Sequence, residues 1–304
     1  MTPNKIIVYD TNRQLTTNIV LKFAQGISCA STDWQVRFQK INRFRKKGLE
    51  KTLRPGVDAV ASLGILRGTG EMFRAAAAAG IDYYYMDHAY FNAGYGGENW
   101  MRIVKNYHTM NWIGNSNGQR YQTLFEKTNP ILPWKNSTQR GDRIVICPPT
   151  DAVSWYAGHK HNWAENVVQQ LKSLLPEKDH SRILVRPKPN EPLVDDAGNL
   201  LGFKQNNTTG DLNSDLESAQ CVIAYNSMVA LTATLKGIPV IGSNYSCCMP
   251  LSFRLHDLAR PQVFDREPVD RRKLIHWLAD NQWSLAEIQD GTAWAQLQEN
   301  NRGV

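Results

Sequence analysis

The clearest hydrophobic pattern lies in the second half of the chain, where short apolar runs alternate with longer segments of helical periodicity. Four runs predict buried strands, at 143–147, 183–185, 221–224 and 239–241. Two segments between them predict helices, at 163–175 and 228–236. Strands that alternate with helices favour a parallel sheet, whose loops and ligands gather at the carboxyl ends of the strands.

The first half has the same alternation of strand and helix. Apolar runs predict strands at 6–9, 59–65 and 82–86, with helices at 15–23 and 71–79. A chain of 304 residues is long enough for two domains, each with its own core. We therefore predict an α/β protein with two sheets.

A polar turn follows the predicted strand 221–224. It consists of Tyr225, Asn226 and Ser227, and the next helix begins at Met228. A turn of this kind aims backbone N–H groups at one spot, which suits a phosphate or another anion. An ordinary strand–helix connection has the same pattern and stays an open alternative.

This segment resembles the donor-side signature of GT-B-type glycosyltransferases, in particular the capsule-polysaccharide-like group. The matching positions are Asn226, Ser227, Val229, Ala233, Gly237, Pro239 and Val240. The acidic residue of that signature falls on Thr232, which is a departure from the pattern. The resemblance implies a GT-B-like α/β fold, with two Rossmann-like domains facing across a cleft.

The same resemblance implies how the chain is divided and what it binds. It implies an acceptor-binding domain at 1–135, a nucleotide-sugar-binding domain at 136–266, and C-terminal helices at 267–304 that pack back on the first domain. The implied donor is a nucleotide sugar, with UDP as the expected nucleotide and no obligatory metal. The residues expected to hold it are Thr150, Arg186, Lys188, Tyr225, Asn226, Ser227 and Met228.

A candidate catalytic pair, Asp87 and His88, follows the aromatic strand 82–86. A carboxylate at the carboxyl end of a strand is placed to take a proton from an acceptor hydroxyl. A turn-forming Asp87 with a packed His88 is the alternative interpretation.

Positive charge is concentrated in one segment of the first half. Eight Lys and Arg residues lie between Arg37 and Arg54, opposed only by Glu50, in a chain whose formal net charge is +7. A basic surface in the acceptor half predicts a polyanionic acceptor such as DNA, contacted by Arg43, Arg45, Lys46 and Lys47. A solvated helix face, an acidic polysaccharide or a membrane surface would satisfy the same charges.

Three segments also resemble glycosyltransferases encoded by bacteriophages: 87–91, 99–103 and 278–294. That resemblance implies transfer to a 5-hydroxymethylpyrimidine in phage DNA. The base would be flipped out of the duplex and received by stacking on the aromatic residues Tyr90, Phe91, Tyr95 and Trp100. Arg102 is a further residue expected to contact the acceptor. The alternatives are transfer to a capsule or other surface glycan, and a non-catalytic nucleic-acid-binding protein with a degenerate GT-B fold.

Neither a signal-peptide pattern nor an apolar run of membrane-spanning length is visible. Five cysteines do not make a disulfide framework. We therefore expect a cytoplasmic protein without a membrane partner.

The basic segment generates a first prediction. Replacing Arg45, Lys46 and Lys47 together by Ala should flatten the dependence of log K for DNA on log salt by up to ~3 units, because each lost phosphate contact removes a slope of about −0.9. Filter-binding titrations at several salt concentrations measure the slope. DNA binding that is insensitive to salt in the wild type would contradict the prediction.

Overall fold

The computed structural model describes residues 3–41, 53–92, 100–159, 162–206 and 210–300. The chain forms two compact units. The first comprises 1–108, 195–200 and 281–304, and the second comprises 109–194 and 201–280.

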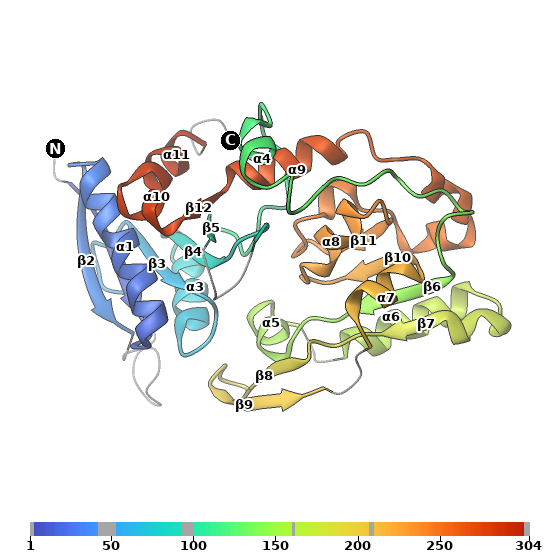
Figure 1. Cartoon of the computed structure of the whole chain (residues 1–304). Coiled ribbons are helices and arrows are strands. Elements are labelled where there is room, and N and C mark those ends of the chain that lie inside the picture. The colour runs from blue at the N-terminus through green and yellow to red at the C-terminus, as the bar shows by residue number, and fades with distance from the viewer. Residues whose placement is uncertain (1–2, 42–52, 93–99, 160–161, 207–209, 301–304) are drawn as a thin grey trace. The chain divides into compact units, whose positions relative to one another are not determined.

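The first unit is built mainly on a six-stranded sheet (Figure 1). Its elements are β1 (Asn4–Asp10), α1 (Gln14–Ala30), β2 (Trp34–Lys40), β3 (Ala59–Leu63), α3 (Thr69–Ala78), β4 (Asp82–His88), β5 (Trp100–Lys105), β12 (Gln282–Ser284), α10 (Leu285–Gln289) and α11 (Thr292–Asn300). The strand order is β12-β5-β4-β3-β1-β2. The four strands from β4 to β2 are parallel, whereas β5 runs antiparallel to both of its neighbours.

The parallel part of this sheet has a topological switch point. The chain first adds β2 on one side of β1, and then β3 and β4 on the other side. In doubly wound sheets of this 2-1-3-4 order, ligands bind outside the carboxyl ends of the strands where the order reverses. The loops that follow β1 and β3 therefore occupy the ligand-binding position of the first unit.

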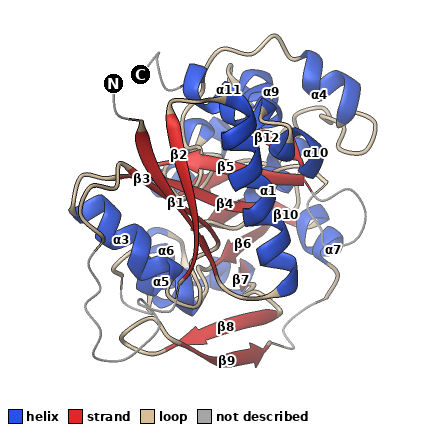
Figure 2. Ribbon diagram, turned by 90° about the vertical axis from the view of Figure 1, so that its left-hand side faces the viewer, coloured by secondary structure: helices blue, strands red, loops and turns tan. Residues whose placement is uncertain are grey.

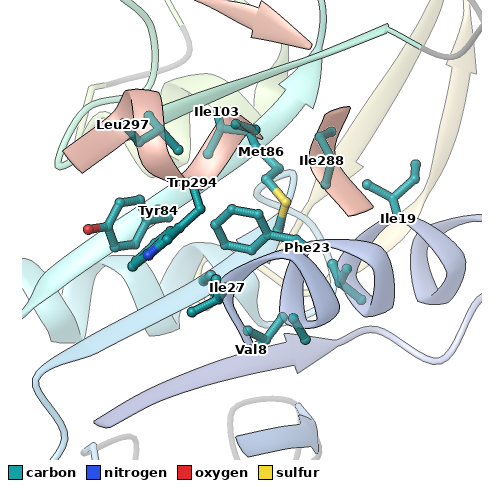
Figure 3. Close-up of a cluster of buried hydrophobic side chains, with 14 of the residues drawn as sticks. Val8, Ile19, Phe23, Ile27, Tyr84, Met86, Ile103, Ile288, Trp294 and Leu297 are labelled. Carbon is teal, nitrogen blue, oxygen red and sulfur yellow. The ribbon is translucent and has the colours of Figure 1, made fainter. Parts of the chain in front are cut away.

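Helices cover both faces of the first sheet. On one face, α1, α10 and α11 bury a core around Phe23, Tyr84, Met86 and Trp294, which Figure 3 shows. The Trp294 ring lies 4.9 Å from Tyr84 and 5.8 Å from Phe23, measured between ring centroids. On the other face, Phe73 of α3 packs against Tyr83 and Tyr85.

The end of the chain returns to the first unit after α9 of the second. Strand β12 pairs with β5, and α10 and α11 lie beside α1 (Figures 1 and 2). A capping box opens α10: Ser284 Oγ accepts from the Glu287 N–H while the Glu287 carboxylate accepts from the Ser284 N–H.

The second unit contains a four-stranded parallel sheet. Its α-helices and strands are α4 (Gln119–Leu124), β6 (Arg143–Cys147), α5 (Asp151–Tyr156), α6 (Trp163–Leu174), β7 (Ile183–Val185), β8 (Asn190–Val194), β9 (Leu200–Gln205), α7 (Leu212–Glu217), β10 (Ala219–Ala224), α8 (Val229–Leu235), β11 (Val240–Gly242) and α9 (Arg271–Asp280). Short 3₁₀ helices lie at Glu177–Arg182, Met249–Leu251, Leu255–Ala259 and Pro261–Asp265.

The second sheet has the order β11-β10-β6-β7, which is again a 2-1-3-4 order. Its switch point lies between β6 and β10, where the Tyr225 N–H donates to Cys147 O at 3.2 Å. One face packs on α6 through Ile144, Ile146 and Leu171. Two mainly parallel sheets with helices confirm the predicted α/β class and its GT-B-like element order.

The division of the chain differs from the expected boundary between 135 and 136. Residues 109–135 belong to the second unit. The Leu132 N–H donates to Leu235 O at 2.8 Å, and the Lys135 N–H donates to Gly237 O at 3.0 Å. Helix α9 also belongs to the second unit, where Arg271 donates to Leu132 O and Thr234 O. Hydrogen bonds to α8 and to Gly237 just after it therefore hold residues 132–135 against the second unit.

Two local features differ from the sequence interpretation or extend it. Arg37 and Lys40 lie in β2, an edge strand, and not on a solvated helix face. The turn at 195–199 joins β8 to β9 as a hairpin, with the Asp195 N–H donating to Asn199 O at 3.0 Å (Figure 2).

The contact between α1 and α10 generates a prediction. A Cβ on Gly26 would lie 1.9 Å from Ile288 O, so Gly26→Ala should lower the free energy of unfolding by ~1–3 kcal/mol through overpacking. Urea unfolding measures the loss. Gln25→Ala, on the exposed side of α1, is the control that should be nearly neutral. Equal stability of the two variants would contradict the close packing.

Candidate functional site

The loops at the switch point of the second sheet gather aromatic rings. Tyr225 follows β10 and stacks on Tyr245, with 5.2 Å between centroids and 17° between planes. Trp163, at the start of α6, and His159, which follows α5, meet Tyr225 edge-on at 5.5 and 5.7 Å. Three parts of the chain, at 159–163, 225 and 245, thus bring rings to one sheet edge.

Tyr225 is deeply buried, and its hydroxyl makes no hydrogen bond to a described residue. The residue is 3% exposed, and its hydroxyl has no hydrogen-bond partner among the residues that the structure describes. Burial raises the pKa of the phenol above its usual range, and Tyr245 adds to the rise. The hydroxyl therefore keeps its proton and is available as a donor. Buried polar atoms are nearly always paired, so this hydroxyl is suited to bind a group beyond the described residues.

The turn after Tyr225 is partly buried, and its side chains make few hydrogen bonds. Ser227 Oγ accepts from the Val229 N–H at 3.3 Å. The Asn226 amide makes no hydrogen bond to any residue that the structure describes. Thr232, in place of the acidic residue of the family signature, donates its hydroxyl to Met228 O at 3.3 Å. Helix α8 spans seven residues and has no side-chain cap.

The other expected donor residues lie after neighbouring strands of the same sheet. Thr150 follows β6 and caps α5, accepting from the Val153 N–H at 3.4 Å. Arg186 follows β7, but its guanidinium forms an ion pair with Asp215 and donates to Gly210 O. The side chain of Lys188 is exposed. The structure thus brings Thr150 to the edge beside Tyr225, while Arg186 already has a carboxylate partner.

In the first unit, Asp87 lies at the end of β4 within a network of donors. Its Oδ2 accepts from Arg102 at 2.9 Å and from the Tyr85 hydroxyl at 2.6 Å. Its Oδ1 accepts from the His88 N–H at 2.8 Å. Because the Tyr85 proton points to Asp87, His108 must donate its Nε2 proton to Tyr85 Oη, 3.2 Å away.

The charges of this network oppose a role for Asp87 as a base. Burial alone would raise the pKa of Asp87, but the charge of Arg102 and the Tyr85 hydrogen bond outweigh it and lower the pKa to about 2. Burial, with Arg102 adding to it, lowers the pKa of His108 to about 4. A general base works best with a pKa near the operating pH. Asp87 as the base stays a prediction, and its contacts fit a fixed ion pair better.

The aromatic residues expected to receive a flipped base lie in the protein interior. Tyr90 is 5% exposed, Phe91 1% and Trp100 7%. Arg102, itself 5% exposed, lies 5.4 Å from the Tyr90 ring centroid. The Phe91 N–H and C=O both bond to the side chain of Gln282 in β12. A base could stack on these rings only if the core opened, so the interior placement corrects that part of the interpretation.

The expected DNA-contacting residues Arg43, Arg45, Lys46 and Lys47 lie outside the described residues, and so does Tyr95 of the expected stacking residues. Within the part of the chain that the structure describes, no helix is long and apolar enough to cross a membrane. The same residues contain no group of three or more His, Cys, Asp or Glu side chains that would hold a metal ion.

Sequence reasoning missed Asp10, the last residue of β1. It is 2% exposed, and its Oδ1 accepts from the Asn12 N–H at 2.9 Å and from the Thr17 hydroxyl at 2.8 Å. A single Asp after a strand matches no motif, so only its contacts reveal it. It lies at the switch point of the first sheet.

No protein-family model matches the chain, and no curated protein matches it. Among solved structures, it is similar to the beta Kdo 2,4 transferase of Thermosulfurimonas dismutans KpsC, with 13% identity over 91% of this chain and 90% of that one, at a TM-score of 0.44. The beta Kdo 2,7 transferase of the same protein gives 12% identity, coverage of 96% and 100%, and a TM-score of 0.41.

A third similar structure is the glycosyltransferase SnogD from Streptomyces nogalater, with 9% identity, coverage of 98% and 99%, and a TM-score of 0.27. The fold is assigned from the strand orders above, not from these similarities.

The His108 network generates a pH prediction. The His108 pKa falls from 6.5 in the unfolded chain to about 4 in the fold, so the unfolded state takes up the proton first. Its contribution to stability is full above pH 6.5 and is lost as the pH falls toward 4. Between pH 7 and pH 5 this amounts to ~2 kcal/mol of unfolding free energy.

His108→Gln should therefore lose less stability than the wild type over this interval in urea unfolding at the two pH values. His256→Gln, at an exposed ring of the second unit, is the control and should decline as the wild type does. An unchanged decline in His108→Gln would refute a neutral buried ring.

Proposed function

We propose that the protein is a glycosyltransferase that moves a sugar from a nucleotide-sugar donor to a hydroxyl acceptor. The observation that carries the proposal is the buried Tyr225 hydroxyl, which has no hydrogen-bond partner among the described residues. It lies beside the stacked Tyr225–Tyr245 rings, at the switch point of a parallel sheet. The turn that resembles the GT-B donor signature, Asn226–Ser227, continues directly from it.

The chemistry of this edge suits a nucleotide. A nucleobase is planar and carries hydrogen-bonding atoms on its rim, so it gains from both an aromatic face and a phenol donor. Tyr245 is the more exposed ring of the pair and would provide the face, while Tyr225 would provide the donor. UDP stays the expected nucleotide.

The leaving group of such a donor gains negative charge as the sugar departs. Hydrogen-bond donors fixed at that place stabilise the transition state more than the ground state. The Asn226 amide makes no hydrogen bond to a described residue and would donate to the leaving phosphate. Backbone N–H groups around Ser227 would do the same. Arg186 would do so only by exchanging its Asp215 partner for the ligand, which makes Lys188 the freer of the two cations.

For the acceptor, we propose 5-hydroxymethylpyrimidine in phage DNA, on the strength of the basic segment and the phage-type resemblance. The interior position of Tyr90, Phe91 and Trp100 gives this acceptor no added support. A surface glycan is the competing acceptor and would use the same donor chemistry.

Mass spectrometry of the products separates these functions. The protein is incubated with a panel of nucleotide sugars and either hydroxymethylated DNA or oligosaccharides. A glycosylated nucleoside would support the DNA acceptor, and an extended oligosaccharide would support the glycan. Nucleotide binding without transfer to any acceptor or to water would favour a non-catalytic binding protein.

The donor site generates a prediction of its own. Asn226→Asp keeps the shape of the side chain but sets a carboxylate where the diphosphate should lie. The loss of a hydrogen bond to a charged group costs ~1.5–3 kcal/mol, so nucleotide affinity should fall by about 10- to 150-fold or more. Calorimetry with UDP and other nucleotides measures the change.

Gln170→Glu, on the exposed side of α6, is the control because it adds the same charge away from the turn. It should bind nucleotide as the wild type does. Unchanged affinity in Asn226→Asp would remove the donor from this turn.

A further inference from the structure

The stacked rings of Tyr225 and Tyr245 belong to two different loops of the second sheet. Tyr225 follows β10 and Tyr245 lies in the loop after β11, and these two strands pair in parallel up to Ala224 and Gly242. The pairing ends where the Ser243 N–H donates to Ala224 O at 3.2 Å. The relative position of the two rings therefore depends on contacts between the loops beyond that point.

The Ser243 hydroxyl connects the main chains of the two tyrosines. It donates its proton to Tyr225 O at 2.6 Å and accepts from the Tyr245 N–H at 3.0 Å. A hydroxyl carries one proton and two lone pairs, so it can make both bonds at once. A single oxygen atom thus bridges the backbones of the two residues whose rings stack.

The turn that carries Tyr245 is fixed by further hydrogen bonds. The Ser246 N–H donates to Ser243 O at 2.9 Å and closes the turn. A serine hydroxyl that accepts from the N–H two residues ahead is a recurring way of ordering such turns. On the outer side, Asn244 O accepts from the Asn111 amide at 2.7 Å. The backbone of Tyr245 is therefore held from both sides.

The two rings differ in how far the protein interior holds them. Tyr225 is 3% exposed, whereas Tyr245 is only partly buried. Their planes lie 17° apart with 5.2 Å between centroids, which is a stacked arrangement. Tyr245 is the ring proposed to provide a face for the nucleobase. A ring that is ordered before the ligand arrives loses less conformational entropy on binding.

We propose that Ser243 is a positioning residue of the nucleotide site, an inference that rests on the proposed function. Its hydroxyl holds the Tyr245 turn against Tyr225 O, so the Tyr245 ring is already in place when a nucleobase stacks on it. Ser243 does not contact the base and acts through Tyr245.

Ser243→Ala tests the proposal because it removes the bridging oxygen and leaves the backbone bonds of the turn in place. Nucleotide affinity should fall by about 3- to 30-fold, since two hydrogen bonds of ordinary strength hold the turn. Calorimetry measures the change, with UDP first and then the other nucleoside mono- and diphosphates. Ser243→Thr keeps the hydroxyl at this partly buried position and should bind nucleotide as the wild type does.

Ser218→Ala is the matched control in the same unit. Ser218 is also partly buried, and its hydroxyl donates to the main-chain carbonyl of Asp215 at 3.0 Å. It directly precedes β10 and so lies at the opposite end of that strand from Tyr225. The variant should lose some thermal stability, as Ser243→Ala should, but its nucleotide affinity should not change.

A double-mutant cycle separates positioning from a general loosening of the loop. Tyr245→Ala is combined with Ser243→Ala, and all four proteins are titrated at nucleotide concentrations high enough to measure weak binding. If Ser243 acts through the Tyr245 ring, Ser243→Ala should have no further effect on affinity once that ring is absent. A purely structural role would give losses that add.

Three outcomes would overturn the proposal: unchanged affinity in Ser243→Ala, an equal loss in Ser218→Ala, and additive losses in the cycle. In each of them the wild type still binds nucleotide, so the proposed function stands. A wild type that binds none of the nucleotides is a different result, which would overturn the proposed donor site and this inference with it.

Discussion

The parallel pairing of strands on both sides of β1 and of β6 is the constraint on which the candidate site depends. Parallel strands bring their carboxyl ends to one edge, and a reversal of strand order keeps the loops at that edge apart. In the first sheet this places Asp10 at the opening, and in the second it places Tyr225 there. Each unit therefore has one predicted ligand position, set by topology before any side chain is considered.

The side chains at these two edges differ in their hydrogen bonds. Asp87, Arg102, Tyr85 and His108 form a connected network in which each carboxylate oxygen has a donor. The Tyr225 hydroxyl, at the switch point of the second sheet, has no hydrogen-bond partner among the described residues. Since buried polar atoms are normally paired, the proposed ligand would complete the contacts of this hydroxyl.

The strands that were predicted well were continuous apolar runs with clear boundaries. The runs 143–147 and 183–185 coincide with β6 and β7. Strand β6 lies inside its sheet, and a strand buried in a parallel sheet must be apolar on both faces. Strand β2 was missed because an edge strand tolerates polar and basic residues such as Arg37 and Lys40. Strand β12 was missed because its pairing with β5 joins residues far apart in sequence.

The site was harder to predict than the fold because several of its contacts join residues that are far apart in sequence. The motif at Asn226–Ser227 is local, so the sequence could place it on a turn between a strand and a helix. Asp87 forms its ion pair with Arg102 across the β4–β5 pair, and Arg186 forms its ion pair with Asp215 of α7.

The most direct measurement of the central claim is a crystal structure of the protein soaked with UDP or with a nucleotide sugar. The account predicts a base that contacts Tyr245 and hydrogen-bonds to the Tyr225 hydroxyl, with its phosphates at Asn226 and Ser227. A nucleotide bound elsewhere, with Tyr225 unchanged, would contradict it.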